Sequence, residues 1–153
     1  MIIEVNKLQK VRIENKNKTI ALTSGTFDLF HVGHLAYLTE VKKYGDIVVV
    51  LLSGDSRVKA RKGSYRPIIK ETDRAQILDS LKIVDYVLMD ERTDENNPVY
   101  KGILSNLNPD YYVTDGPDPR FYNLIERSKF VIVDRMKEEP STTSIIKRIL
   151  DSQ

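Results

Sequence analysis

The two histidines of this chain stand three residues apart in a segment suited to binding phosphate. His31 and His34 lie in the run 25–34, which follows a short apolar stretch and precedes an amphipathic one. Imidazoles at such a junction can donate hydrogen bonds to phosphate oxygens as charge develops in a transition state. If a helix starts near residue 32, its first amides lack intrahelical partners and its dipole favours an anion. The segment therefore predicts a phosphate site.

The residues alone leave a second interpretation of this run open. Gly25 permits a tight turn, and Gly33 lets a ligand approach the helix backbone. The run lacks the Lys-Ser/Thr pair of a Walker loop. Its histidines could instead be structural or form part of a zinc site, although the chain offers no third histidine and no cysteine. The residues alone are compatible with both the phosphate and the structural interpretation.

The pattern Gly-Thr-Phe-Asp-x-x-His-x-Gly-His resembles the signature of the cytidylyltransferase-like nucleotidyltransferase superfamily, and all its fixed positions are met. The resemblance implies in-line displacement at a nucleoside triphosphate, without a covalent enzyme intermediate. It assigns catalysis to His31 and His34, which stabilise the triphosphate. Asp28 is expected to brace the loop or contact substrate. The resemblance also implies that five residues of the signature bind the nucleotide: Gly25, Thr26, Phe27, Asp28 and Gly33.

A basic segment follows the next apolar stretch, with four cations within eight residues: Lys59, Arg61, Lys62 and Arg66. Its glycine and proline indicate a mobile loop. Charge runs are usually solvated surface, but this one follows a strand, where a polyphosphate would lie, and lysine suits phosphate. The spacing Lys-x-x-Lys-Gly with Arg-Pro resembles heptose-phosphate adenylyltransferases. That resemblance implies nucleotide binding by Lys59, catalysis by Lys62 and acceptor binding by Arg66.

A third segment, Ser-Thr-Thr before an apolar periodic run, predicts a helix N-terminus by its capping residues. Its hydroxyls suit a second phosphate-binding helix end. The segment also resembles the Ser-Thr-Thr-x-Ile motif that closes the nucleotide site in the superfamily, which implies nucleotide contacts from Ser141, Thr142 and Thr143. Arg74 fits the family's helix-opening arginine, which implies a nucleotide contact, and a surface arginine is the alternative.

Two departures leave the nucleotide and the acceptor open. Residues 135–140 are one residue longer and more acidic than the Arg-Thr-x-Gly-Ile run of glycerol-phosphate cytidylyltransferases. Residues 114–118 read Thr-Asp-Gly-Pro-Asp where heptose-phosphate adenylyltransferases have Lys-Gly-Gly-Asp. Asp115 is expected beside the nucleotide. Acceptor contacts are expected from the variable loops 90–97 and 114–122, with these candidates: Asp118, Arg120 and Tyr122.

The elements that position these residues alternate between strands and helices. Apolar runs predict strands at 19–23, 47–52, 84–89, 111–113 and 130–133. Apolar spacing and capping residues predict helices at 2–14, 33–44, 72–81, 99–107, 120–127 and 141–150. We expect an α/β, Rossmann-like single domain over 1–153, with a leading helix and loop at 1–18 and a core at 19–150. Its parallel sheet has five strands and helices on both faces. Ligands of such sheets bind beyond the strand carboxyl ends, where the strand order reverses.

Composition excludes several other classes. The formal net charge of +2 gives no nucleic-acid footprint. The longest apolar stretch, 47–52, is far shorter than the ~20 residues of a membrane span, and no signal-peptide pattern is present. The chain has no cysteine for a disulfide or thiolate site, as suits a reducing compartment. We expect a cytoplasmic protein without nucleic-acid or membrane partners.

Together these resemblances imply a nucleotidyltransferase that moves a nucleoside monophosphate from a triphosphate to a phosphorylated small molecule and releases pyrophosphate. The likeness of the basic segment and of the leading helix to heptose-phosphate adenylyltransferases favours ATP with a sugar phosphate. CTP with an alditol phosphate such as glycerol 3-phosphate is the alternative, and flavin mononucleotide and phosphopantetheine adenylyltransferases share the first motif. A non-catalytic nucleotide-binding module is the alternative from another class. We expect Mg²⁺ held mainly by the nucleotide phosphates, no separate protein metal site, and, from the resemblance, a homodimer.

Overall fold

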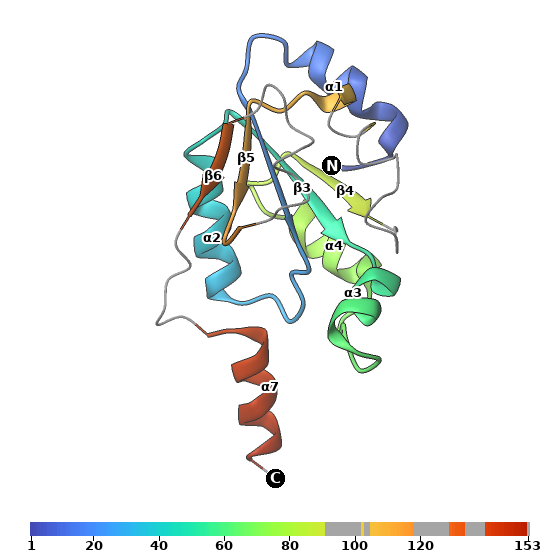
Figure 1. Cartoon of the computed structure of the whole chain (residues 1–153), viewed down its shortest axis with the longest axis vertical. Coiled ribbons are helices and arrows are strands. Elements are labelled where there is room, and N and C mark those ends of the chain that lie inside the picture. The colour runs from blue at the N-terminus through green and yellow to red at the C-terminus, as the bar shows by residue number, and fades with distance from the viewer. Residues whose placement is uncertain (91–101, 103–104, 118–128, 134–139, 153) are drawn as a thin grey trace.

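The computed structural model describes residues 1–90, 102, 105–117, 129–133 and 140–152 (Figure 1). The helix predicted at 120–127 lies outside these residues, and the one predicted at 99–107 is described only at 102 and 105–107, which are helical. None of the described helices is long and apolar enough to cross a membrane. The elements in chain order are β1 (Ile2–Ile3), η1 (Val5–Lys7), α1 (Leu8–Glu14), β2 (Ile20–Gly25), α2 (Val32–Lys42), β3 (Ile47–Ser53), α3 (Asp55–Lys62), α4 (Glu71–Asp79), β4 (Tyr86–Asp90), β5 (Tyr111–Thr114), β6 (Lys129–Ile132) and α7 (Thr142–Leu150).

The described strands form one parallel sheet in the order β1-β4-β3-β2-β5-β6. The predicted α/β, Rossmann-like fold is confirmed, but the sheet has six strands instead of five. The additional strand is β1, in which Ile2 pairs with Val87 of β4. The helical spacing that began at residue 2 was misleading because the edge of β4 satisfies the backbone there, and the α-helix begins only at Leu8.

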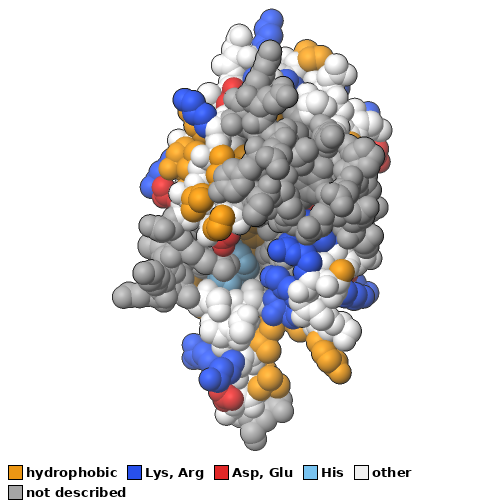
Figure 2. Space-filling view, in the orientation of Figure 1, with side chains coloured by type: hydrophobic (Ala, Val, Ile, Leu, Met, Phe, Trp, Pro, Cys, Tyr) orange, Lys and Arg blue, Asp and Glu red, His pale blue; other side chains and the backbone are white. Residues whose placement is uncertain are grey.

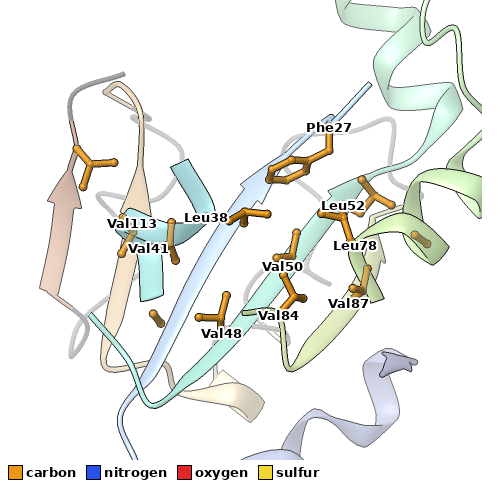
Figure 3. Packing of buried hydrophobic residues seen from close by; sticks show 13 residues of the cluster. Phe27, Leu38, Val41, Val48, Val50, Leu52, Leu78, Val84, Val87 and Val113 are labelled. Atoms are coloured by element: carbon orange, nitrogen blue, oxygen red, sulfur yellow. The ribbon is translucent and has the colours of Figure 1, made fainter. Parts of the chain in front are cut away.

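Helices cover both faces of the sheet, as predicted. Every residue of β3 is buried, and its side chains alternate between two cores. One core joins Val48, Val50 and Leu52 to α2 and α4 (Figure 3). The other joins Val49 and Leu51 to α1. An apolar run without alternation is therefore the sequence signature of a strand covered on both sides.

The strand order reverses at β2. From β2 the chain moves outward through β3 and β4, then crosses to β5 and β6 on the other side of β2. The carboxyl end of β2, at Gly25, therefore opens the loop that carries the histidines at the point where ligands of such sheets bind. Helix α3 follows the carboxyl end of β3 at the same edge, and α7 lies beyond that edge (Figure 1).

The basic segment is not the loop that the sequence predicted. Lys59, Arg61 and Lys62 lie in the last turn of α3, and Gly63 ends the helix with a φ of 94°. The helix escaped prediction because Val58 is its one buried aliphatic residue, so the apolar periodicity of a surface helix is missing. The two lysines are consequently carried by a helix whose start is fixed to the sheet edge.

Candidate phosphate and nucleotide site

The first loop turns sharply at the end of β2. Phe27 and Leu29 both adopt left-handed backbone conformations, with φ values of 50° and 47°. The Phe27 ring is buried in the core next to α2 and α4 (Figure 3). A Cβ at Gly25 would lie 2.6 Å from this ring. The glycine is therefore required by the ring that packs over it, whereas the left-handed turn is made by Phe27 and Leu29 and not by Gly25.

We expect Gly25→Ala to destabilise the protein by about 1–3 kcal/mol, because the Phe27 ring must shift to admit the methyl group. Activity should fall with it, since Phe27 contacts the His34 ring. Denaturant unfolding and turnover measure the two effects. Gly102→Ala is the control, since a Cβ there meets nothing within 4 Å. Equal losses in the two variants would contradict this explanation.

The two histidines form a stacked pair at the start of α2. His31 is the N-cap residue, and its Nδ1 accepts a hydrogen bond from the Gly33 amide at 3.1 Å. In the neutral ring this leaves the proton on Nε2, where it can be donated. The His34 ring stacks on His31 with centroids 3.9 Å apart. The rings of Phe27 and Phe30 contact the His34 ring at centroid distances of 5.3 and 5.4 Å. These aromatic contacts fix the orientation of the His34 imidazole.

Asp28 joins three segments of this edge. Its buried carboxylate accepts hydrogen bonds from Arg66 Nε at 2.9 Å and from the amides of Ile68 and Ile69 at 3.0 Å. Its backbone carbonyl accepts a hydrogen bond from Thr142 Oγ1 at 2.8 Å. We call these four interactions the Asp28 clamp. It ties the histidine loop to the α3–α4 connection and to the start of α7.

Arg74 is a buried arginine, so the alternative of a surface residue is wrong. Its Nε donates to the Ile69 carbonyl at 2.9 Å, and its Nη1 donates to the carbonyls of Thr26 at 2.5 Å and Ser53 at 2.9 Å. Its Nη2 pairs with the Asp55 carboxylate at 2.7 Å. Arg74 therefore connects the ends of β2 and β3 to the starts of α3 and α4.

A second buried ion pair supports α3. Arg57 Nε lies 3.6 Å from Asp90 Oδ2, and both side chains are almost fully buried. Sequence reasoning missed this pair and the partnership of Asp55 with Arg74. The burial of Arg74 had a signal, because it stands four residues before the buried Leu78 on α4. Arg57 had none in the polar sequence of α3.

The Ser-Thr-Thr segment forms the predicted helix N-terminus. Ser141 caps α7, since its Oγ accepts a hydrogen bond from the Ser144 amide at 3.1 Å and Ser144 Oγ accepts one from the Ser141 amide at 2.9 Å. Thr142 is bonded to the Asp28 carbonyl, and Thr143 is exposed. A second helix start therefore lies against the loop that carries the histidines.

The structure thus brings three predicted segments to one edge of the sheet: the histidine loop, the basic segment and the start of α7. Lys59 and Lys62 are exposed on α3. Histidine surface lies beside Lys and Arg side chains in the region of α3 (Figure 2). Asp115 is exposed on the loop after β5. Three predicted acceptor contacts lie outside the described residues: Asp118, Arg120 and Tyr122. Helix-start amides, imidazoles and lysines form an arrangement suited to a polyphosphate.

Both a family model and curated proteins match this chain. A model of the cytidylyltransferase-like family matches residues 22–149. The bifunctional protein HldE of Aliarcobacter butzleri is 38% identical over 98% of this chain, and that of Helicobacter acinonychis is 38% identical over 97%. The chain covers only 30% and 31% of these two relatives.

Solved structures show the same fold. A lipopolysaccharide core biosynthesis protein from Thermoplasma volcanium superposes with a TM-score of 0.63 at 26% identity, covering 78% of this chain and 99% of that one. A pantoate-β-alanine ligase from Francisella tularensis also gives a TM-score of 0.63, at 16% identity, over 97% of this chain and 72% of that one. The second likeness concerns the fold alone.

Proposed function

Because this chain belongs to the cytidylyltransferase-like family, we propose that it transfers AMP from ATP to a phosphorylated sugar and releases pyrophosphate. The observation that carries the proposal is the stacked pair of His31 and His34 at the N-terminus of α2, at the point where the strand order reverses. The imidazoles lie there at a helix N-terminus, whose dipole favours the triphosphate.

The reaction needs positioning and charge neutralisation more than proton transfer. A phosphate oxygen of the acceptor attacks the α-phosphorus, a new P–O bond forms, and the bond to the β-phosphate oxygen breaks in line. An ionised phosphate is already a nucleophile, so no general base is required. His31, His34 and Lys62 neutralise the charge that develops on the phosphates and the departing pyrophosphate. The start of α7, at Ser141, supports the same phosphates.

The other proposed nucleotide contacts divide into direct and indirect ones. Thr26 and Phe27 lead from the strand to the histidines, and Gly33 exposes the backbone of the first helical turn. Lys59 and Thr143 are exposed and can reach a phosphate directly. Arg74 is bonded to the Thr26 carbonyl and would act through the loop backbone. Asp115 contributes from the loop after β5.

Mg²⁺ is proposed to accompany the triphosphate, and when bound it neutralises phosphate charge. The carboxylate nearest the histidines in sequence, Asp28, already accepts N–H donors on both oxygens, which fits an ion held mainly by the nucleotide. A homodimer in the cytoplasm, without nucleic-acid or membrane partners, completes the proposal.

A sugar phosphate is proposed as the acceptor on two grounds. The spacing Lys-x-x-Lys-Gly with Arg-Pro resembles heptose-phosphate adenylyltransferases. The Thermoplasma volcanium relative is a lipopolysaccharide core biosynthesis protein, and such cores are built from sugars.

Pyrophosphate release with Mg²⁺ tests the proposal, with ATP and CTP each offered to sugar 1-phosphates, glycerol 3-phosphate, flavin mononucleotide and phosphopantetheine. We expect release with ATP and a sugar 1-phosphate. Release with CTP and glycerol 3-phosphate alone would replace the adenylyl assignment by the cytidylyl one. Nucleotide binding without release from any pair would favour a non-catalytic binding module.

A further inference from the structure

Arg66 is held in an unusual way at the site edge. The side-chain hydrogen bond that the described part of the chain gives it comes from Nε alone, which donates to Asp28. A guanidinium has five N–H donors, and four of them are on the two terminal nitrogens. Only 14% of the Arg66 side chain is exposed, so the guanidinium lies against the protein and does not extend into solvent. One edge of the guanidinium is thus fixed while its terminal nitrogens remain available for a ligand.

The anchor that fixes Arg66 is rigid. Asp28 has none of its side chain exposed, and its carboxylate also accepts the amides of Ile68 and Ile69. Asp28 stands three residues before His31, and its carbonyl is bonded to Thr142. The Asp28 clamp therefore fixes Arg66 relative to the histidine loop and to α7 at once.

The negative charge of Asp28 affects phosphate affinity in two ways. A carboxylate beside an anion site weakens anion binding by direct repulsion. Here the same carboxylate holds a guanidinium, and a fixed guanidinium fork binds phosphate through charge-assisted, bidentate hydrogen bonds. The direct effect and the positioning effect of Asp28 on phosphate affinity therefore have opposite signs.

We propose that Asp28 is a positioning residue that turns Arg66 into a fork for a phosphate group, belonging either to the nucleotide or to the acceptor. The inference rests on the proposed function and deepens it, because it gives the acidic residue of the signature a defined task. Arg66 touches the ligand, and Asp28 acts on it through Arg66.

Binding titrations with ATP–Mg²⁺, inorganic pyrophosphate and a hexose 1-phosphate test the proposal. We expect Arg66→Gln to weaken the phosphate ligand that it contacts by roughly 10- to 100-fold. Asp28→Asn should weaken the same ligand, although it removes a negative charge. The double variant should bind no more weakly than Arg66→Gln alone, because both changes remove one interaction. The probe that responds identifies the source of the phosphate.

Two further variants separate positioning from general stability. Arg66→Lys keeps a cation beside Asp28 but lacks the planar fork, so it should keep the melting temperature and lose affinity. Asp110→Asn is the matched control. Asp110 directly precedes β5, and its carboxylate likewise accepts hydrogen bonds from an arginine, Arg12 Nη1 at 3.1 Å, and from a backbone amide, that of Ile20 at 2.8 Å. The Asp110→Asn variant should have a lower melting temperature and unchanged phosphate affinity.

The outcomes are distinguishable from failure of the proposed function. Unchanged or tighter phosphate binding by folded Asp28→Asn would overturn the positioning role, as would additive losses in the double variant or wild-type affinity in Arg66→Lys. If Asp28→Asn does not fold, wild-type phosphate affinity in Arg66→Gln or Arg66→Lys would still overturn the proposal. Wild-type binding of ATP without pyrophosphate release would refute the proposed function while leaving the binding results for Asp28 intact.

Discussion

Replacing His34 by alanine is expected to lower turnover by roughly 10²–10³-fold, because a donor aimed at the developing charge on the phosphates is lost. The ring is held on one side by His31, 3.9 Å away, and on others by Phe27 and Phe30. This packing holds the imidazole in one orientation, on which the catalytic contribution that we propose for it depends. Steady-state kinetics measured by pyrophosphate release provides the test.

Two further variants make the His34 result specific. Leu35→Ala, next along α2 and 41% exposed, should keep wild-type turnover. His34→Gln retains a hydrogen-bond donor and should recover part of the activity. Because His34 is buried, the thermal stability of each variant is measured alongside. A folded His34→Ala variant with wild-type turnover would remove this residue from the catalytic account.

Replacing Arg74 by methionine is expected to have the largest effect on stability, a loss of about 3–5 kcal/mol. The change leaves the Asp55 carboxylate without its guanidinium and leaves three backbone carbonyls without a donor. Unsatisfied buried acceptors cost more than the hydrogen bonds gained on folding. For a chain of this length the melting temperature should fall by roughly 10 °C, as followed by calorimetry.

Controls distinguish this effect from the loss of any arginine. Arg61→Met, on the exposed side of α3, should change the free energy of unfolding by less than about 0.5 kcal/mol. Adding Asp55→Asn to the Arg74 variant should recover part of the loss, because it removes the uncompensated charge. A loss from Arg74→Met as small as that from Arg61→Met would show that the buried guanidinium is not a structural connection.

The fold was largely predictable because its main elements have local signals. The apolar run of β3, the helical spacing before Gly45 and the capping residues before α7 each act within a few residues. β1 and α3 lacked such signals. β1 depends on the distant edge of β4, and α3 carries too few apolar residues to show a period.

The residues of the candidate site were predictable from the sequence, but the hydrogen bonds and ion pairs between them were not. The signature residues were found from their spacing, and the expected bracing role of Asp28 agrees with its buried clamp. The partners of its carboxylate, however, lie 38–41 residues further along the chain, Thr142 lies 114 residues further, and only the tertiary fold brings them together. The buried guanidiniums of Arg57 and Arg74 were missed for a related reason, since arginine is rarely buried unless it is paired.

We propose that this chain moves AMP onto a sugar phosphate by displacement at the α-phosphorus, and this proposal can be tested without knowing the sugar in advance. Its most direct test is a reaction of ATP labelled with ³²P at the α-position, with Mg²⁺ and a sugar 1-phosphate, followed by separation of the products. We expect the label in a new ADP-sugar and none in the released pyrophosphate, with His34→Ala strongly reduced. Label that remains in ATP, or that appears only in free AMP, would contradict the account.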